Sequence, residues 1–177
     1  MKDFQKLLEA LWVKYISPEE RESSVVFRWK DGTPFPVSPR QLNLTRNATA
    51  TDGNCFYHAF IFSKWGACAT TKAADVKAVL VENFTLLKNK IAEGGQQWDN
   101  ALVRLKSIND FAENEEIEMV AEFYNTRINV WIVHMETWRV FIPTEFDHTR
   151  GDVVYVQLIG SVNKQNNTLG IHFESLV

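Results

Sequence analysis

One stretch of this 177-residue sequence decides how the rest is interpreted: Asp52-Gly53-Asn54-Cys55-Phe56-Tyr57-His58-Ala59. The Asp-Gly-Asn tripeptide predicts a tight turn, because glycine permits positive φ and Asp or Asn tolerates turn geometry. An apolar pattern with helical spacing follows directly and continues to Trp65. The sequence therefore predicts a helix over residues 55–65, with Cys55 in its first turn.

The position of Cys55 gives it a possible chemical role. Backbone N–H groups at a helix N-terminus lack intrahelical partners, and the positive end of the helix dipole stabilises a thiolate and lowers the thiol pKa. The same N–H groups could bind the oxyanion of a tetrahedral intermediate. Cys55 is therefore a candidate nucleophile, and Asp52 is a candidate organiser of the oxyanion loop or third member of a catalytic triad.

A cysteine nucleophile needs a base, and the sequence contains four histidines. His58 is close to Cys55 but is expected on the helix surface, His134 follows a predicted strand, and His148 lies in a polar loop. His172 is in a predicted strand with apolar neighbours. Side chains two apart on a strand leave the same face, so Glu174 could orient the His172 ring. Among the four, His172 is the candidate general base and acid with a possible orienter beside it.

The remaining pattern places helices before strands. It predicts one continuous helix over 76–91 closed by Gly94-Gly95, followed by helices over 98–108 and 117–124 and strands over 128–133, 138–142 and 153–159. Residues 160–169 read as a polar loop, and residues 171–176 as a last short strand. This order predicts an α+β fold with helices packed against a mostly antiparallel sheet.

The N-terminal part of the chain has a different character. Apolar residues at helical spacing from Phe4 to Ile16 predict an amphipathic helix that ends at Ser17-Pro18, and a proline-rich irregular segment follows. We predict an N-terminal extension over residues 1–46, packed on a catalytic domain over residues 47–177.

Composition excludes several classes of protein. Apolar residues make up 45% and charged residues 23%, which is typical of a globular chain, and two cysteines cannot form a disulfide framework. No apolar run approaches the ~20 residues that span a bilayer, and a net charge of −3 argues against a nucleic-acid partner. Cys55, His58 and Cys68 lack a fourth ligand for zinc, so no metal is expected. We expect a reducing, cytoplasmic location.

Three blocks resemble the ovarian-tumour (OTU) family of papain-like cysteine peptidases. The stretch 52–59 resembles the family's nucleophile motif. Glu115–Tyr124 followed by Ile128-Asn129-Val130 resembles its helix-then-strand element, and Gly170–Leu176 resembles its terminal strand with a histidine and an aromatic residue. The blocks occur in family order and span residues 52–176.

The resemblance implies a papain-like OTU fold and a deubiquitinase that hydrolyses the isopeptide or peptide bond after the C-terminal glycine of ubiquitin. It implies Cys55 as nucleophile, His172 as general base, a role for Asp52, no cofactor, and ubiquitin or polyubiquitin as partner of a monomeric enzyme. The family usually has Asp or Asn two residues after the histidine, where this chain has Glu174. The residue that orients the His172 ring could therefore be either Glu174 or Asp52.

Two alternative functions are compatible with the same residues. One is a cysteine peptidase that acts on a ubiquitin-like modifier or a polyprotein. The other is a non-catalytic ubiquitin-binding module with a degraded site, which only the departure at Glu174 favours. The presence of both Cys55 and His172 argues against this second alternative.

Overall fold

The computed structural model describes residues 38–91, 96–163 and 168–177. Its helices are α3 (Cys55–Trp65), α4 (Ala73–Glu82), α5 (Phe84–Ile91), α6 (Gln96–Lys106) and α7 (Asn114–Phe123), with 3-10 turns η1 (Pro39–Leu42) and η2 (Val133–Met135). Its strands are β1 (Arg46–Asn47), β2 (Thr126–Ile132), β3 (Thr137–Phe141), β4 (Asp152–Asn163) and β5 (Thr168–Leu176). The amphipathic helix predicted before Ser17 lies outside the described residues.

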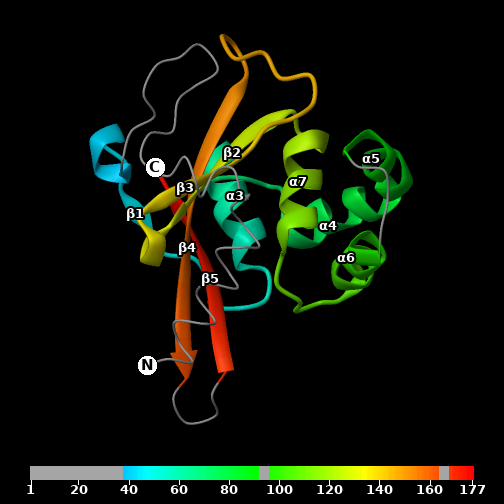
Figure 1. The fold of residues 1–177 in the computed structure, drawn as a ribbon, viewed down its shortest axis with the longest axis horizontal. Coiled ribbons are helices and arrows are strands. Elements are labelled where there is room, and N and C mark those ends of the chain that lie inside the picture. The colour runs from blue at the N-terminus through cyan, green and yellow to red at the C-terminus, as the bar shows by residue number, and fades with distance from the viewer. Residues whose placement is uncertain (1–37, 92–95, 164–167) are drawn as a thin grey trace.

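The strands form one sheet in the order β1-β5-β4-β2-β3. The β2–β4 pair is parallel, and the β1–β5, β4–β5 and β2–β3 pairs are antiparallel. Helix α3 packs on β5 and β4, while α7 lies between the sheet and the group formed by α4, α5 and α6 (Figure 1). The predicted α+β fold with a mostly antiparallel sheet is confirmed.

The polar loop predicted over 160–169 is wrong at residues 160–163 and 168–169, which are strand; residues 164–167 lie outside the described residues. Strands β4 and β5 continue past the main sheet as a two-stranded ribbon, paired from Gly160↔Ile171 to Asn163↔Thr168. The parallel pairing with β2 ends at Ile132↔Leu158, so no third strand of the described part of the chain pairs with this ribbon. Backbone pairing between two strands holds the ribbon without requiring apolar side chains, which is why a polar sequence can form it.

The single helix predicted over 76–91 is also wrong, because the chain forms α4 and α5 with a break at Asn83. The Asn83 side-chain amide donates to the carbonyl of Val79 (2.8 Å), and the Asn83 backbone leaves helical geometry at φ −103° and ψ 14°. An asparagine that bonds the preceding turn ends a helix even where the apolar spacing continues. The closure predicted at Gly94-Gly95 lies outside the described residues.

The core that supports the predicted site lies between α3 and one face of the sheet. The rings of Phe56 and Phe60 on α3 and of Phe173 on β5 are fully buried, and Phe56 meets Phe173 edge to face at a centroid distance of 5.3 Å. Burying such side chains contributes roughly 1.5–3 kcal/mol each. This packing fixes the start of α3 against β5.

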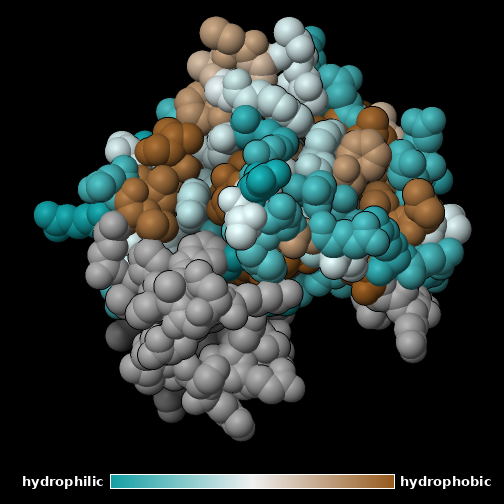
Figure 2. Space-filling model, turned by 90° about the horizontal axis from the view of Figure 1, so that it is seen from above, coloured by the Kyte–Doolittle hydropathy of each residue, from teal (hydrophilic) through white to brown (hydrophobic). Residues whose placement is uncertain are grey.

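The opposite face of the sheet carries a smaller cluster of Trp131, Trp138 and Leu176. At the surface, hydrophobic residues gather in separate patches among polar ones (Figure 2). Within the described residues, no helix has the length and apolar character needed to cross a membrane.

The segment that precedes the helices also joins the sheet. Strand β1 pairs with the end of β5, with Arg46 opposite Leu176 and Asn47 opposite Ser175. Residues 38–46 are the described part of the predicted extension. The division of the chain between residues 46 and 47 stays a prediction.

Candidate active site

The turn before α3 is closed by its own hydrogen bonds. The backbone N–H of Cys55 donates to the carbonyl of Asp52 (3.2 Å), and the N–H of Asn54 donates to Asp52 Oδ1 (2.9 Å). The carbonyl of Asn54 then accepts the first helical bond, from the N–H of His58 (3.0 Å). Cys55 is the first residue of α3, as the sequence predicts, and the Asp52 carboxylate organises the turn.

Gly53 is needed in this turn for space and not for positive φ, since Gly66 is the one described glycine with a positive φ. A Cβ atom on Gly53 would lie 1.6 Å from the carbonyl oxygen of Asn109. On the same side, the Asn54 side-chain amide donates to the carbonyl of Ile108 (3.0 Å). The segment that follows α6 therefore packs directly against the turn that carries Cys55.

The Cys55 thiol is buried against β5. Its Sγ accepts a hydrogen bond from the backbone N–H of Phe173 (3.3 Å), so the sulfur lies beside the residue that follows His172. Burial raises the pKa of the Cys55 thiol and the negative charge of Asp52 adds to this, while hydrogen bonds from Phe173 and Phe56 oppose it. The expectation from the sequence that the pKa of the Cys55 thiol is lowered is therefore wrong. The thiol needs a base in order to form the thiolate.

His172 lies on β5 with Glu174 as its partner. The His172 Nε2 atom is 3.3 Å from Glu174 Oε1, as strand alternation predicts. Because Nε2 faces this carboxylate, Nδ1 is the ring nitrogen that remains to accept a proton. The Asp52 carboxylate instead lies 3.4 Å from Nε2 of His58. Of the two candidate orienters, Glu174 is the one in contact with His172.

Glu174 is held by two residues that the sequence analysis missed. Arg46 Nη2 donates to Oε1 (2.8 Å), Arg46 Nε contacts Oε2, and Gln157 Nε2 donates to Oε2 (2.8 Å). Burial would raise the pKa of the Glu174 carboxyl, but the bonds from Arg46 and Gln157 and the charges of Arg46 and His172 outweigh it and lower the pKa. Glu174 is therefore an anion despite its burial.

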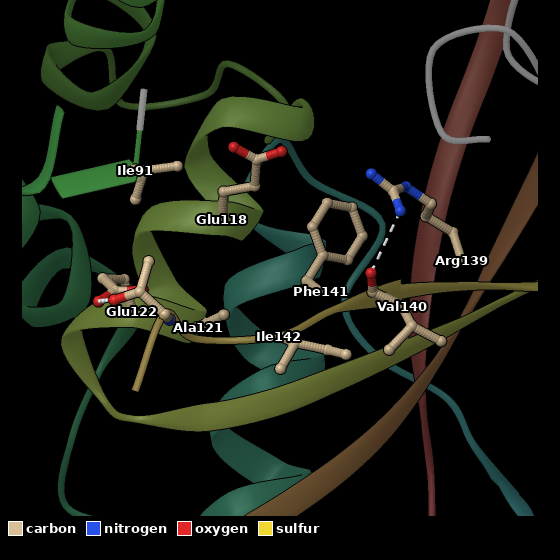
Figure 3. Close-up of a pocket in the computed structure, with 9 residues that line it drawn as sticks. Ile91, Glu118, Ala121, Glu122, Arg139, Val140, Phe141 and Ile142 are labelled. Atoms are coloured by element: carbon tan, nitrogen blue, oxygen red, sulfur yellow. Dashed lines mark hydrogen bonds between the residues drawn. The ribbon is translucent and has the colours of Figure 1, made fainter. Parts of the chain in front are cut away.

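Two of the hollows in the described structure differ in their position relative to this region. One, of about 420 Å³, is lined by α7 and β3; there the Arg139 guanidinium donates to the carbonyl of Val140 (3.3 Å) and lies over the Phe141 ring (Figure 3). It contains none of the predicted site residues. The other, of about 480 Å³, is lined by Asn54 and Lys77 among others and adjoins the turn before Cys55.

Within residues 38–91, 96–163 and 168–177, no three His, Cys, Asp or Glu side chains come together as a metal site. The Cys55 thiol is hydrogen-bonded to the β5 residue that follows His172, an arrangement that suits nucleophilic catalysis by a thiol.

Comparison with known proteins finds its matches among solved structures. The sequence matches no protein-family model and no curated protein sequence. In structure, the chain is similar to the OTU domain of OTUD1, with a TM-score of 0.56 and 15% identity over 78% of this chain and 88% of that one.

Two further solved structures show the same similarity. An OTU deubiquitinase from Wolbachia pipientis matches with a TM-score of 0.52 and 15% identity over 76% of this chain and 88% of that one. The Hazara virus OTU, solved bound to ubiquitin, matches with a TM-score of 0.52 and 17% identity over 81% of this chain and 84% of that one. The fold of this chain is therefore the fold of the OTU domains.

Proposed function

We propose that this protein is a cysteine-dependent deubiquitinase that hydrolyses the isopeptide or peptide bond after the C-terminal glycine of ubiquitin. One observation carries the proposal: Cys55 Sγ at the start of α3 accepts a bond from Phe173 N–H, directly beside the His172–Glu174 pair. This arrangement lies in a chain with the OTU fold, and OTU domains similar to it in structure were solved bound to ubiquitin.

The proposed reaction begins with proton transfer. His172 Nδ1 takes the proton of the Cys55 thiol, and the thiolate attacks the carbonyl carbon of the terminal glycine. The imidazolium then gives its proton to the leaving amine, which leaves an acyl-enzyme. Water, deprotonated by His172, hydrolyses the thioester and restores the thiol. Because burial raises the pKa of Cys55, the base is needed for the first step.

The oxyanion of each tetrahedral intermediate needs donors close to Cys55. The backbone N–H of Cys55 makes only a long bond of 3.2 Å to the Asp52 carbonyl, so an oxyanion can compete for it. The Asp52 carboxylate accepts from Asn54 N–H and keeps the turn in shape. We therefore assign Asp52 to the oxyanion loop and the orienting role to Glu174.

The partners and location follow from the same proposal. Ubiquitin or polyubiquitin is the substrate, and the enzyme acts as a monomer without a cofactor. A thiol nucleophile is active only when reduced, which suits the cytoplasm. An enzyme with this activity would take part in the ubiquitin conjugation pathway by removing the modifier.

Covalent capture tests the proposal. We expect ubiquitin with a C-terminal alkyne or vinyl electrophile to form a 1:1 adduct with the protein, seen by mass spectrometry, because the site must place that terminus at Cys55 Sγ. The Cys68→Ala variant, which changes the exposed second cysteine, is the matched control and should react like the wild type.

The other functions give different results in this assay. Capture by an electrophile built on a ubiquitin-like modifier, with none by the ubiquitin probe, would support the peptidase of other specificity. Ubiquitin binding without any adduct would support the non-catalytic module. Capture that persists in Cys55→Ala would place the nucleophile elsewhere.

Removal of the orienter should impair the enzyme without abolishing activity. We expect Glu174→Ala to lower kcat/KM by roughly 10- to 100-fold, or ~1.4–2.7 kcal/mol, because the ring of His172 loses the carboxylate that fixes it and stabilises its charged form. Glu174→Gln keeps an acceptor oxygen without the charge and should fall between Ala and wild type. Hydrolysis of a fluorogenic ubiquitin substrate at neutral pH measures both variants. Wild-type kcat/KM in both would show that Glu174 does not orient His172.

A further inference from the structure

A short segment before the predicted nucleophile runs along β5, the strand that carries His172. Thr45 exchanges two backbone hydrogen bonds with Val177, of 2.7 and 2.9 Å, and β1 continues this pairing. The Thr49 hydroxyl then donates to the carbonyl of Phe173. Residues 45–49 are thus fixed at several points beside the strand that holds the His172–Glu174 pair.

Arg46 of this segment points its guanidinium at Glu174. Its Nη2 and Nε atoms contact different oxygens of the carboxylate, a two-pronged contact that fixes the plane of the carboxylate. Gln157 holds Oε2 from the opposite strand β4, directly across from Glu174 in the sheet. The Glu174 side chain is 2% exposed and that of Arg46 is 63% exposed, so the cation covers a buried anion from the solvent side.

The Glu174 carboxylate therefore contacts two basic side chains at once. Oε1 accepts from Arg46 (2.8 Å) and lies 3.3 Å from His172 Nε2. Oε2 accepts from Gln157 on β4, which is neutral. The charge of Arg46 thus stabilises the anion that contacts the His172 ring.

We propose that Arg46 is a positioning residue for His172: its fork holds the Glu174 carboxylate in the place and plane in which Oε1 contacts His172 Nε2. A ring held in this way keeps Nδ1 free to take the proton of the Cys55 thiol. The catalytic consequence rests on the proposed function, whereas the coupling of Arg46 to the His172 ring does not.

The test follows the His172 ring by NMR in the free protein, with signals assigned by histidine variants. We expect Arg46→Gln to shift the ring ¹⁵N signals of His172, because a Glu174 carboxylate without the fork no longer holds Nε2 in one geometry. Arg46→Lys keeps a cation without the fork and should shift these signals less. Arg40→Gln, which removes an exposed cation from the same part of the chain, is the matched control and should leave them unchanged.

Hydrolysis of a ubiquitin substrate gives the second measurement. Arg46→Gln should lower kcat a few-fold with KM unchanged, and Arg46→Lys should restore part of the loss because it keeps a cation beside Glu174. Unchanged His172 signals in Arg46→Gln, or the same change in Arg40→Gln, would overturn the proposal. Changed signals in a protein that hydrolyses no ubiquitin substrate would support the coupling and contradict only the proposed function.

Discussion

The Cys55→Ala variant is expected to lose hydrolysis of ubiquitin substrates by at least about 10⁴-fold while it still binds ubiquitin. The proposed reaction forms a thioester on Sγ, and the second cysteine, Cys68, is exposed on the loop between α3 and α4. Binding should persist because it depends on the surface around the site. Initial rates measure turnover, and titration with ubiquitin by fluorescence anisotropy measures affinity.

The fold of the variant needs its own measurement. Removal of Sγ takes away the hydrogen bond that the N–H of Phe173 donates to it, and a lost hydrogen bond costs about 0.5–1.5 kcal/mol. Thermal unfolding of Cys55→Ala and Cys55→Ser separates this cost from the chemical loss, since serine can still accept the bond. Residual turnover near the wild-type rate in a folded Cys55→Ala protein would contradict the assignment of the nucleophile.

Local patterns predicted those parts of the fold that local forces determine. The Asp-Gly-Asn turn and the apolar residues after it gave α3 with the bounds that the structure has, Cys55–Trp65. The break at Asn83 was missed because one side-chain bond to Val79 outweighs continued apolar spacing. The ribbon beyond Leu158 was missed because pairing between β4 and β5 does not depend on the polarity of their side chains.

Some contacts of the candidate site follow from local patterns in the sequence, and others depend on the packed structure. The contact between His172 and Glu174 follows from strand alternation and could be predicted. Gln157 and Arg46 could not, because their contacts with Glu174 depend on which strands lie beside β5. The direction of the Cys55 pKa was wrong for a related reason, since burial of the thiol under β5 is a property of the packed structure.

Substitution of His172 should cause the second large loss of activity. His172→Ala should lose about as much kcat as Cys55→Ala, because a buried thiol with a raised pKa gives little thiolate without its base. The double variant Cys55→Ala/His172→Ala should lose no more than either single variant, since nucleophile and base act as one unit. Ubiquitin affinity should again stay close to that of the wild type.

His58 provides the matched control, because the site contains two pairs of histidine and carboxylate. His172 lies 3.3 Å from Glu174 on β5, and His58 lies 3.4 Å from Asp52 at the start of α3. The His58 side chain is 38% exposed, so its removal should cost less than about 3-fold in kcat/KM. If His58→Ala lost most of the activity and His172→Ala kept it, the proton acceptor would be the His58–Asp52 pair. The strand β5 would then supply only the N–H that binds Sγ, and the orienting role of Glu174 would fall with it.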